Sequence, residues 1–193
     1  MKKYLFYIII IIVILAQYAF SWDNKVTHKD ITRYAAEMSV LGINTGDYLK
    51  QLGFIDGLYD SIKWENQETI FSVGPVKEWL AEGSSLEDTA PRWMNHFHNP
   101  LKLWADAGLW ENNTQWKSAV LWAQDDAFQS GPETGGGDWS WRKVRSSFYS
   151  ALTAQNKIDR EAFFAQMFRG LGQQMHLVQD MAVPYHVRND AHI

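Results

Sequence analysis

Three potential metal ligands lie close together near the end of the chain, in residues 170–190. His176 and Asp180 are four residues apart, so on a helix their side chains project from the same face, one turn apart. Pro184 cannot continue that helix, and the chain must turn before it presents His186. This pattern is compatible with a metal pocket that takes two ligands from a helix and one from the loop after it. An isolated histidine and carboxylate at this spacing are more often a buried hydrogen-bonded pair, and that interpretation stays open.

A second group of potential ligands lies in EGSSLEDTAPRWMNHFHNP, residues 82–100, whose composition predicts a loop. This segment contains Glu87, Asp88, His96 and His98. Carboxylates and histidines on loops between rigid helices are a frequent source of site chemistry. A solvated polar loop would account for the acids equally well, but it accounts poorly for His96, which has an aromatic neighbour.

His28 lies near the start of a further predicted helix, which Asp23 or Thr27 can cap and which runs to about Val40. The helical period places His28 on the inward-facing side of this helix. A single inward-facing histidine is more often a buried residue with satisfied hydrogen bonds than a metal ligand. Both interpretations of His28 therefore remain open.

The other elements that must position these side chains are also predicted to be helices. They cover residues 47–52, 76–81, 101–109, 116–128, 139–153 and 160–181. In the last helix, Gly172 precedes His176 by one turn on the same face, so a metal or another helix can approach closely there. The apolar stripe of this helix is expected to contain Phe164, Met167, Phe168, Leu171, Met175 and Val178. No alternating strand pattern persists, so we expect an all-α fold.

Residues 1–21 have the features of a secretory signal peptide. Two lysines precede an apolar run over residues 4–16, and Ala19 and Ser21 occupy the small-residue positions of a cleavage site. The alternative is an uncleaved membrane anchor, although the run is short for a span. Cleavage would make Trp22 the amino terminus, where a free amine and its own carbonyl can chelate a cation.

Length, charge and cysteine content narrow the class of protein. The chain has 193 residues, 46% of them hydrophobic, which suits one domain with a substantial core. Cleavage would move the formal charge from −4 to −6 by removing two lysines, and no basic cluster suited to phosphate neutralisation appears. The glycine-rich residues 130–138 lack the lysine of a phosphate-binding loop and are expected to form a surface loop. The chain has no cysteine, so an exported form must be held by its core, by bound metal or by both.

Four separated features occur together in this chain: the tryptophan at the predicted cleavage point, His28, the sequence EDTAPRWMNHFHNP and the run HLVQDMAVPYH. In combination they resemble the zinc-dependent phospholipase C family, which shares its fold with the single-strand-specific nucleases of fungi and plants. The resemblance covers essentially the whole chain after cleavage, thinly between the motifs. It implies one helical domain, residues 22–193, that holds up to three zinc ions.

The resemblance implies ligands for two of these ions. The amine and carbonyl of Trp22, together with His28, would hold one zinc ion. Asp88, His96 and His176 would hold a second. Asp88 is also expected to orient or deprotonate the attacking water, since a carboxylate beside a metal-activated water can act as a base.

Asp180 would bridge these two ions, and His186 would begin a third site. In the family, that site is completed by a later histidine, for which His192 is the candidate, and by a glutamate about one turn further on. No glutamate follows His192 in this sequence. We therefore expect that the carboxyl-terminal part of the domain is missing and that the third ion binds weakly. His98 lies outside the pattern.

These features predict a secreted zinc-dependent phosphodiester hydrolase, acting as a monomer, that cleaves phospholipid head groups at a membrane surface by a phospholipase C reaction. Nitrogen and carboxylate ligands without thiolate suit zinc, and paired metals can activate water for phosphoryl displacement. One alternative is a single-strand-specific nuclease or nucleotidase of the same fold, acting on nucleic acid. The absence of cysteine disfavours it, because fungal and plant nucleases of this fold are usually disulfide-bonded. The other is a non-catalytic zinc-binding protein, exported or membrane-tethered.

Overall fold

The computed structural model describes residues 25–42, 47–66, 69–124, 126–130 and 137–190. The predicted signal peptide, Trp22 and His192 lie outside these ranges, as does most of the glycine-rich segment. The expectations for them stay predictions.

The described part of the chain is mostly helical, as predicted. Its α-helices are α2 (Thr27–Met38), α3 (Asp47–Gln51), α4 (Val76–Glu87), α5 (Ala119–Gln124), α6 (Asp126–Gln129), α7 (Trp141–Thr153), α8 (Lys157–Asp180) and α9 (Pro184–Arg188), with short 3-10 helices η1 (Gly57–Tyr59) and η2 (Arg92–Asn95). None of the described helices is both long enough and apolar enough to cross a membrane.

The expectation of an all-α fold is wrong in one respect, because two small antiparallel sheets are present. Strand β1 (Ser61–Lys63) pairs with β2 (Val73–Pro75), placing Ile62 opposite Gly74. Strand β3 (Trp110–Glu111) pairs with β4 (Thr114–Gln115). Strands of two or three residues are too short for an alternating pattern to show in the sequence.

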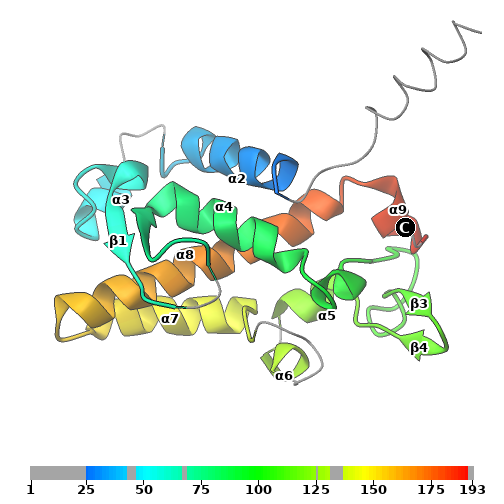
Figure 1. Ribbon diagram of the computed structural model, residues 1–193. Coiled ribbons are helices and arrows are strands. Elements are labelled where there is room, and N and C mark those ends of the chain that lie inside the picture. Colours follow the sequence, from blue (N-terminus) through cyan, green and yellow to red (C-terminus); the bar gives the residue numbers. More distant parts are fainter. Residues whose placement is uncertain (1–24, 43–46, 67–68, 125, 131–136, 191–193) are drawn as a thin grey trace, which may run out of the picture.

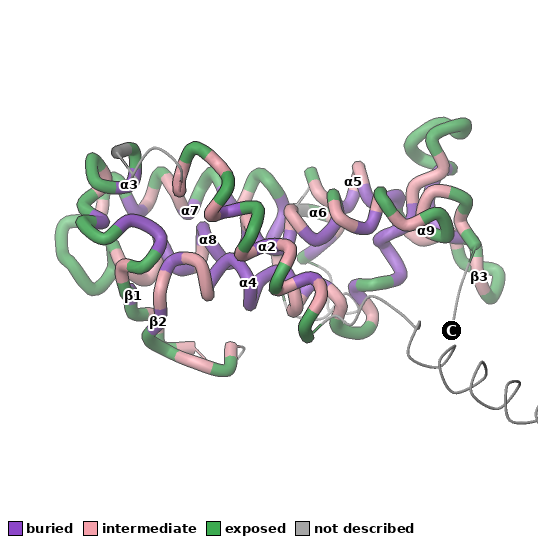
Figure 2. Tube along the Cα trace, turned by 90° about the horizontal axis from the view of Figure 1, so that it is seen from above, coloured by how far each residue is buried: buried purple, intermediate pink, exposed green. Residues whose placement is uncertain are grey.

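Helix α8 is the central element of the fold. It packs against both α4 and α7, and α2 lies against α4 (Figure 1). Buried residues follow α4 and α8 through the middle of the molecule, while exposed residues dominate the outer loops (Figure 2). Helix α3 and the β1–β2 pair lie at one end of this arrangement, and α9 and the β3–β4 pair lie at the other (Figure 1).

One row of α8 side chains, spaced four residues apart, is buried from Phe164 to the end of the helix. The row consists of Phe164, Phe168, Gly172, His176 and Asp180, all of them buried. The predicted apolar stripe is therefore correct in its first half and wrong at Val178, whose side chain is 73% exposed. Val178 is two residues from both His176 and Asp180, which places it on the opposite face of the helix.

Two glycines allow α4 and α8 to cross at close range. A Cβ atom on Gly172 would clash with the backbone carbonyl of Leu80, and one on Gly83 would clash with the carbonyl of Arg169. The close approach predicted at Gly172 is thus confirmed, and the approaching element is a helix. The helix predicted over residues 76–81 is longer than expected, because Gly83 serves the crossing and does not end the helix, and α4 continues to Glu87.

Two predicted helices in the second half of the chain are different in the structure. Residues 101–109 form turns, closed by a hydrogen bond of 2.9 Å from the Asn99 N–H to the Ala107 carbonyl. Leu101 is exposed, so a helix here would lack a surface on which to bury its apolar face. Residues 116–128 contain two short helices, α5 and α6, in place of one.

Candidate metal centre

The six predicted ligands that lie within the described ranges come from separate parts of the fold and meet at one end of α8. They are His28 on α2, Asp88 directly after α4, His96 directly after η2, His176 and Asp180 on α8, and His186 on α9. Pro184 does end the preceding helix, as predicted, but His186 then lies on the new short helix and not in a loop.

Three imidazole nitrogens surround one carboxylate oxygen. Asp180 Oδ2 lies 2.8 Å from His96 Nδ1, 3.1 Å from His176 Nε2 and 3.2 Å from His186 Nδ1. This oxygen is buried and has no aligned hydrogen bond within the described residues. Ligand atoms about 2.0 Å from a tetrahedral ion lie roughly 3.3 Å apart. His176 Nε2 and His96 Nδ1 are 3.2 Å apart, so these two nitrogens and Asp180 Oδ2 have the spacing of three ligands of one ion.

The other oxygen of Asp180 faces His28. His28 Nε2 lies 3.6 Å from Asp180 Oδ1, and the His28 ring stacks on His176 with a centroid distance of 4.0 Å. On the far side of the ring, His28 Nδ1 is 2.8 Å from Gln179 Oε1, and Gln179 donates a 2.8 Å hydrogen bond to the Thr32 hydroxyl. The contact with Gln179 therefore orients His28 so that Nε2 points toward the cluster. Asp180 directs one carboxylate oxygen to His28 and the other to His96, His176 and His186.

Asp88 lies at the rim of the cluster. Its Oδ1 is 4.0 Å from His96 Nδ1, and its side chain is 27% exposed, whereas His96 and Asp180 are almost fully buried. The ligand atoms of His28, Asp88 and His176 lie within 4.8 Å of one another, as do those of His96, His176 and Asp180. The two groups share His176, so they form one continuous cluster of donors that could hold a metal ion.

Electrostatics in the metal-free chain already favour a cation at this place. Burial would raise the pKa of Asp180, but the imidazoles of His176, His186 and His96 outweigh it and hold that pKa far below its usual range. Burial would lower the pKa of His96, but the carboxylates of Asp180 and Glu87 raise it to about 10. Burial and His176 lower the pKa of His28. A proton on His96 therefore balances the anion, and a bound metal ion would replace it.

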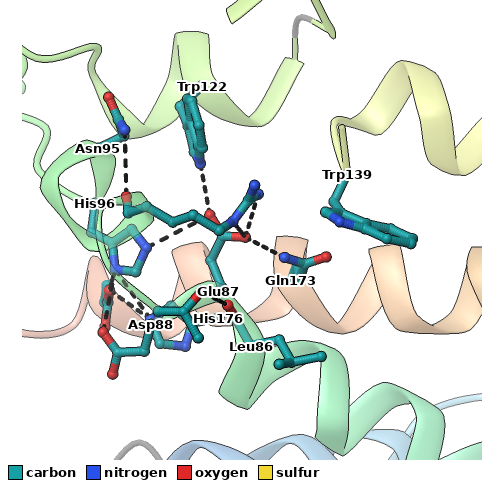
Figure 3. Close-up of polar contacts among 12 residues, drawn as sticks. Leu86, Glu87, Asp88, Asn95, His96, Trp122, Trp139, Gln173 and His176 are labelled. Atoms are coloured by element: carbon teal, nitrogen blue, oxygen red, sulfur yellow. Dashed lines mark hydrogen bonds and ion pairs between the residues drawn. The ribbon is translucent and has the colours of Figure 1, made fainter. Parts of the chain in front are cut away.

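Glu87 supports the cluster from outside it, a role that the sequence analysis did not identify. Its carboxylate is buried between His96, Trp122 and Gln173 (Figure 3). Burial would raise the pKa of Glu87, but Arg92 and His96 lower it to about 2, so the group is an anion. The acidic pair Glu87 and Asp88 was visible in the sequence, but the prediction of a loop over residues 82–100 hid the burial of Glu87.

His98 lies outside both groups of ligand atoms, as expected. Its backbone N–H donates a 2.9 Å hydrogen bond to the carbonyl of His186, which ties this segment to α9. Burial lowers the pKa of its side chain.

No family model, curated protein or solved structure matches this chain. The function therefore has to be inferred from the cluster and from the motifs that supply it.

Proposed function

We propose that this protein is an exported zinc-dependent phosphodiester hydrolase that cleaves phospholipid head groups by a phospholipase C reaction. The observation that carries the proposal is the convergence of three buried imidazole nitrogens on Asp180 Oδ2, with His28 facing the second oxygen of the same carboxylate. These side chains belong to the motifs that resemble the zinc-dependent phospholipase C family.

The donor set supports zinc as the metal. Imidazole and carboxylate groups without thiolate suit a hydrolytic zinc site, and the sequence contains no cysteine. His96, His176 and Asp180 would hold one ion, and His28 would contribute to a second together with the other Asp180 oxygen. His186 would begin a third site, as the resemblance implies. An anionic carboxylate shared by two cations offsets part of the charge of both, which is the bridging role that the resemblance implies for Asp180.

Asp88 is the residue that we assign to proton transfer. Zinc bound in this cluster supplies Lewis acidity, which lowers the pKa of a coordinated water and neutralises charge on a phosphodiester. Asp88 is the most exposed carboxylate of the cluster, so its free oxygen can accept a proton from an attacking water at the rim. His96 and Asp180 are buried behind it and restrict solvent access to this side.

The test compares two substrates and one inhibitor on the purified chain. Hydrolysis of a chromogenic phosphocholine ester should exceed cleavage of single-stranded DNA, should stop with a strong chelator and should return with added zinc. Cleavage of DNA alone would identify a nuclease. Bound zinc without hydrolysis of either substrate would identify a non-catalytic zinc-binding protein and would reject the proposal.

A further inference from the structure

A buried carboxylate next to the metal centre has no task in the reaction proposed above. Glu87, the last residue of α4, is 1% exposed and faces away from the solvent-accessible rim. Its Oε2 accepts hydrogen bonds from Arg92 Nε at 3.1 Å, Arg92 Nη2 at 2.8 Å and Gln173 Nε2 at 2.8 Å. Its Oε1 accepts one from Trp122 Nε1 at 2.6 Å. A buried anion is costly unless it is paired and hydrogen-bonded, and this one is both.

The groups that hold Glu87 are themselves held by other parts of the chain. Arg92 also donates to the Gly137 carbonyl and to Gln129 Oε1, both at 2.9 Å. Gln129 in turn donates a 2.6 Å hydrogen bond to the Trp122 carbonyl. The carboxylate of Glu87 is thus fixed by α5, α6, α8 and the segment before α7, so its orientation is set independently of the histidine that it faces.

That histidine is His96, whose ring lies between two carboxylates. Its Nε2 is 3.6 Å from Glu87 Oε1 (Figure 3), and its Nδ1 is 2.8 Å from Asp180 Oδ2. In a neutral imidazole one nitrogen carries a proton and the other a lone pair. A proton on Nε2 is attracted to Glu87, whereas a lone pair there would face a buried anion. Nδ1 faces a carboxylate as well in the metal-free chain, so the two nitrogens differ only once an ion lies between Nδ1 and Asp180. With the ion in place, Glu87 favours the tautomer whose Nδ1 lone pair points to it.

We propose that Glu87 is a positioning residue for the metal centre, which holds His96 in the Nε2–H tautomer and presents Nδ1 to the ion. The inference rests on the proposed function only in requiring that zinc binds the cluster. An anionic partner also makes the imidazole a stronger donor, and losing such a partner typically lowers metal affinity by about 10- to 100-fold. His28 has the neutral Gln179 in the corresponding place, so the ion on the His96 side should be the more tightly bound.

The variant that tests this is Glu87→Gln, which removes the charge and keeps the shape. Glu82→Gln is the matched control, because Glu82 is also buried on α4 and also forms an ion pair, at 2.7 Å to Lys29. Zinc dissociation constants are measured by competition with a chelator of known affinity. Glu87→Gln should raise the constant for the tighter ion by about 10- to 100-fold, and Glu82→Gln should leave it within about twofold.

A second readout uses the unsubstituted chain and so does not depend on how any variant folds. Long-range ¹⁵N–¹H spectra of the zinc-loaded, ¹⁵N-histidine-labelled protein should show His96 protonated at Nε2 and metal-bound at Nδ1. The opposite assignment would overturn the inference, as would equal zinc affinities for the two variants. Zinc binding with the expected tautomer but without phosphodiester hydrolysis would reject only the proposed function. Failure of the unsubstituted chain to bind zinc would reject both.

Discussion

The two halves of helix α8 are both buried and are stabilised by different physics. In the first half, Phe164 and Phe168 pack edge-to-face against Phe54, with ring centroids 4.8 and 5.8 Å away. In the second half, the same row of positions carries His176 and Asp180, which meet other imidazoles and no apolar core.

This difference shows how one helix can combine a scaffold with a site. Burial of aromatic rings needs no partner from solution, so the first half is stable on its own account. The second half gathers a buried anion and several imidazoles, whose mutual attraction depends on a proton or a metal ion among them. The two halves should therefore respond in opposite ways to core mutation and to metal removal.

Asp180→Asn should have the largest effect, and the effect should be confined to the second half of α8 and its ligand cluster, here called the metal half. An amide cannot neutralise two cations, so zinc affinity should fall by more than about 100-fold and hydrolysis should be lost. Zinc content and rate are the measurements. Glu161→Gln is the control, because this partly buried acid on the first half of α8 lies far along the helix from the cluster and pairs with Lys157. Comparable losses in the two variants would contradict a bridging role for Asp180.

Phe168→Ala should lower the free energy of unfolding through the first half of α8 and leave the metal cluster intact. Removing a fully buried phenylalanine costs about 3–5 kcal/mol of unfolding free energy. Zinc content at a temperature where the variant remains folded should not change, because Phe168 contacts none of the ligands. Val178→Ala, on the exposed face of the same helix, should cost less than about 0.5 kcal/mol. Zinc loss from folded Phe168→Ala would show that the two halves are not separable.

Removing the metal should destabilise the second half of α8 and leave the first half intact. An ion present at about 1,000 times its dissociation constant stabilises the folded chain by roughly 4 kcal/mol, and a chelator removes that contribution. Hydrogen exchange should show the loss of protection concentrated in residues 176–188, with residues 160–168 retaining theirs. A uniform loss along α8 would indicate that the helix opens as one unit.

Acid should produce a smaller, graded effect on the metal half through Glu87. The pKa of Glu87 is lowered from 4.5 to about 2, so its contribution is complete above pH 4.5 and is lost as the pH falls toward 2. At about 1.4 kcal/mol per pK unit this amounts to roughly 3 kcal/mol. Unfolding of the metal-free chain by urea, measured between pH 5 and pH 2, should show a flatter pH dependence for Glu87→Gln. Parallel curves for the two proteins would contradict the shift.

The sequence predicts the metal half of α8 better than its surroundings, because the spacing of His176 and Asp180 is local information. Helical periodicity fixes their common face, and Pro184 marks the end of the helix. The extent of α4 is not local information: Gly83 resembles a helix stop, but it is required by the backbone of Arg169, which crosses it. Such a tertiary requirement leaves no mark in the sequence around the glycine.

The residues that orient the ligands were harder to predict than the ligands themselves. Gln173 and Gln179 make decisive hydrogen bonds, yet glutamine on a helix is usually solvated and neither position breaks the polar pattern. Glu87 looked like part of a polar loop because the stretch after Gly83 contains serines and acids. A metal ligand can be recognised in the sequence from the chemistry of its side chain. The residue that orients the ligand can be recognised only when the helix packed against it is known.

The close crossing of α4 and α8 also bears on which ion fits. Gly83 and Gly172 each stand one turn before a residue of the cluster or its support, Glu87 and His176. The separation of the two backbones therefore affects how near Asp88, which follows α4, lies to the ligands on α8. The imidazole nitrogens lie 2.8–3.2 Å from Asp180 Oδ2, a spacing that suits an ion with ligands at about 2.0 Å, while calcium prefers oxygen ligands at about 2.3–2.6 Å. An added methyl group at either glycine should push α4 away from α8 and so move Asp88, and Glu87 behind His96, away from the ligands on α8.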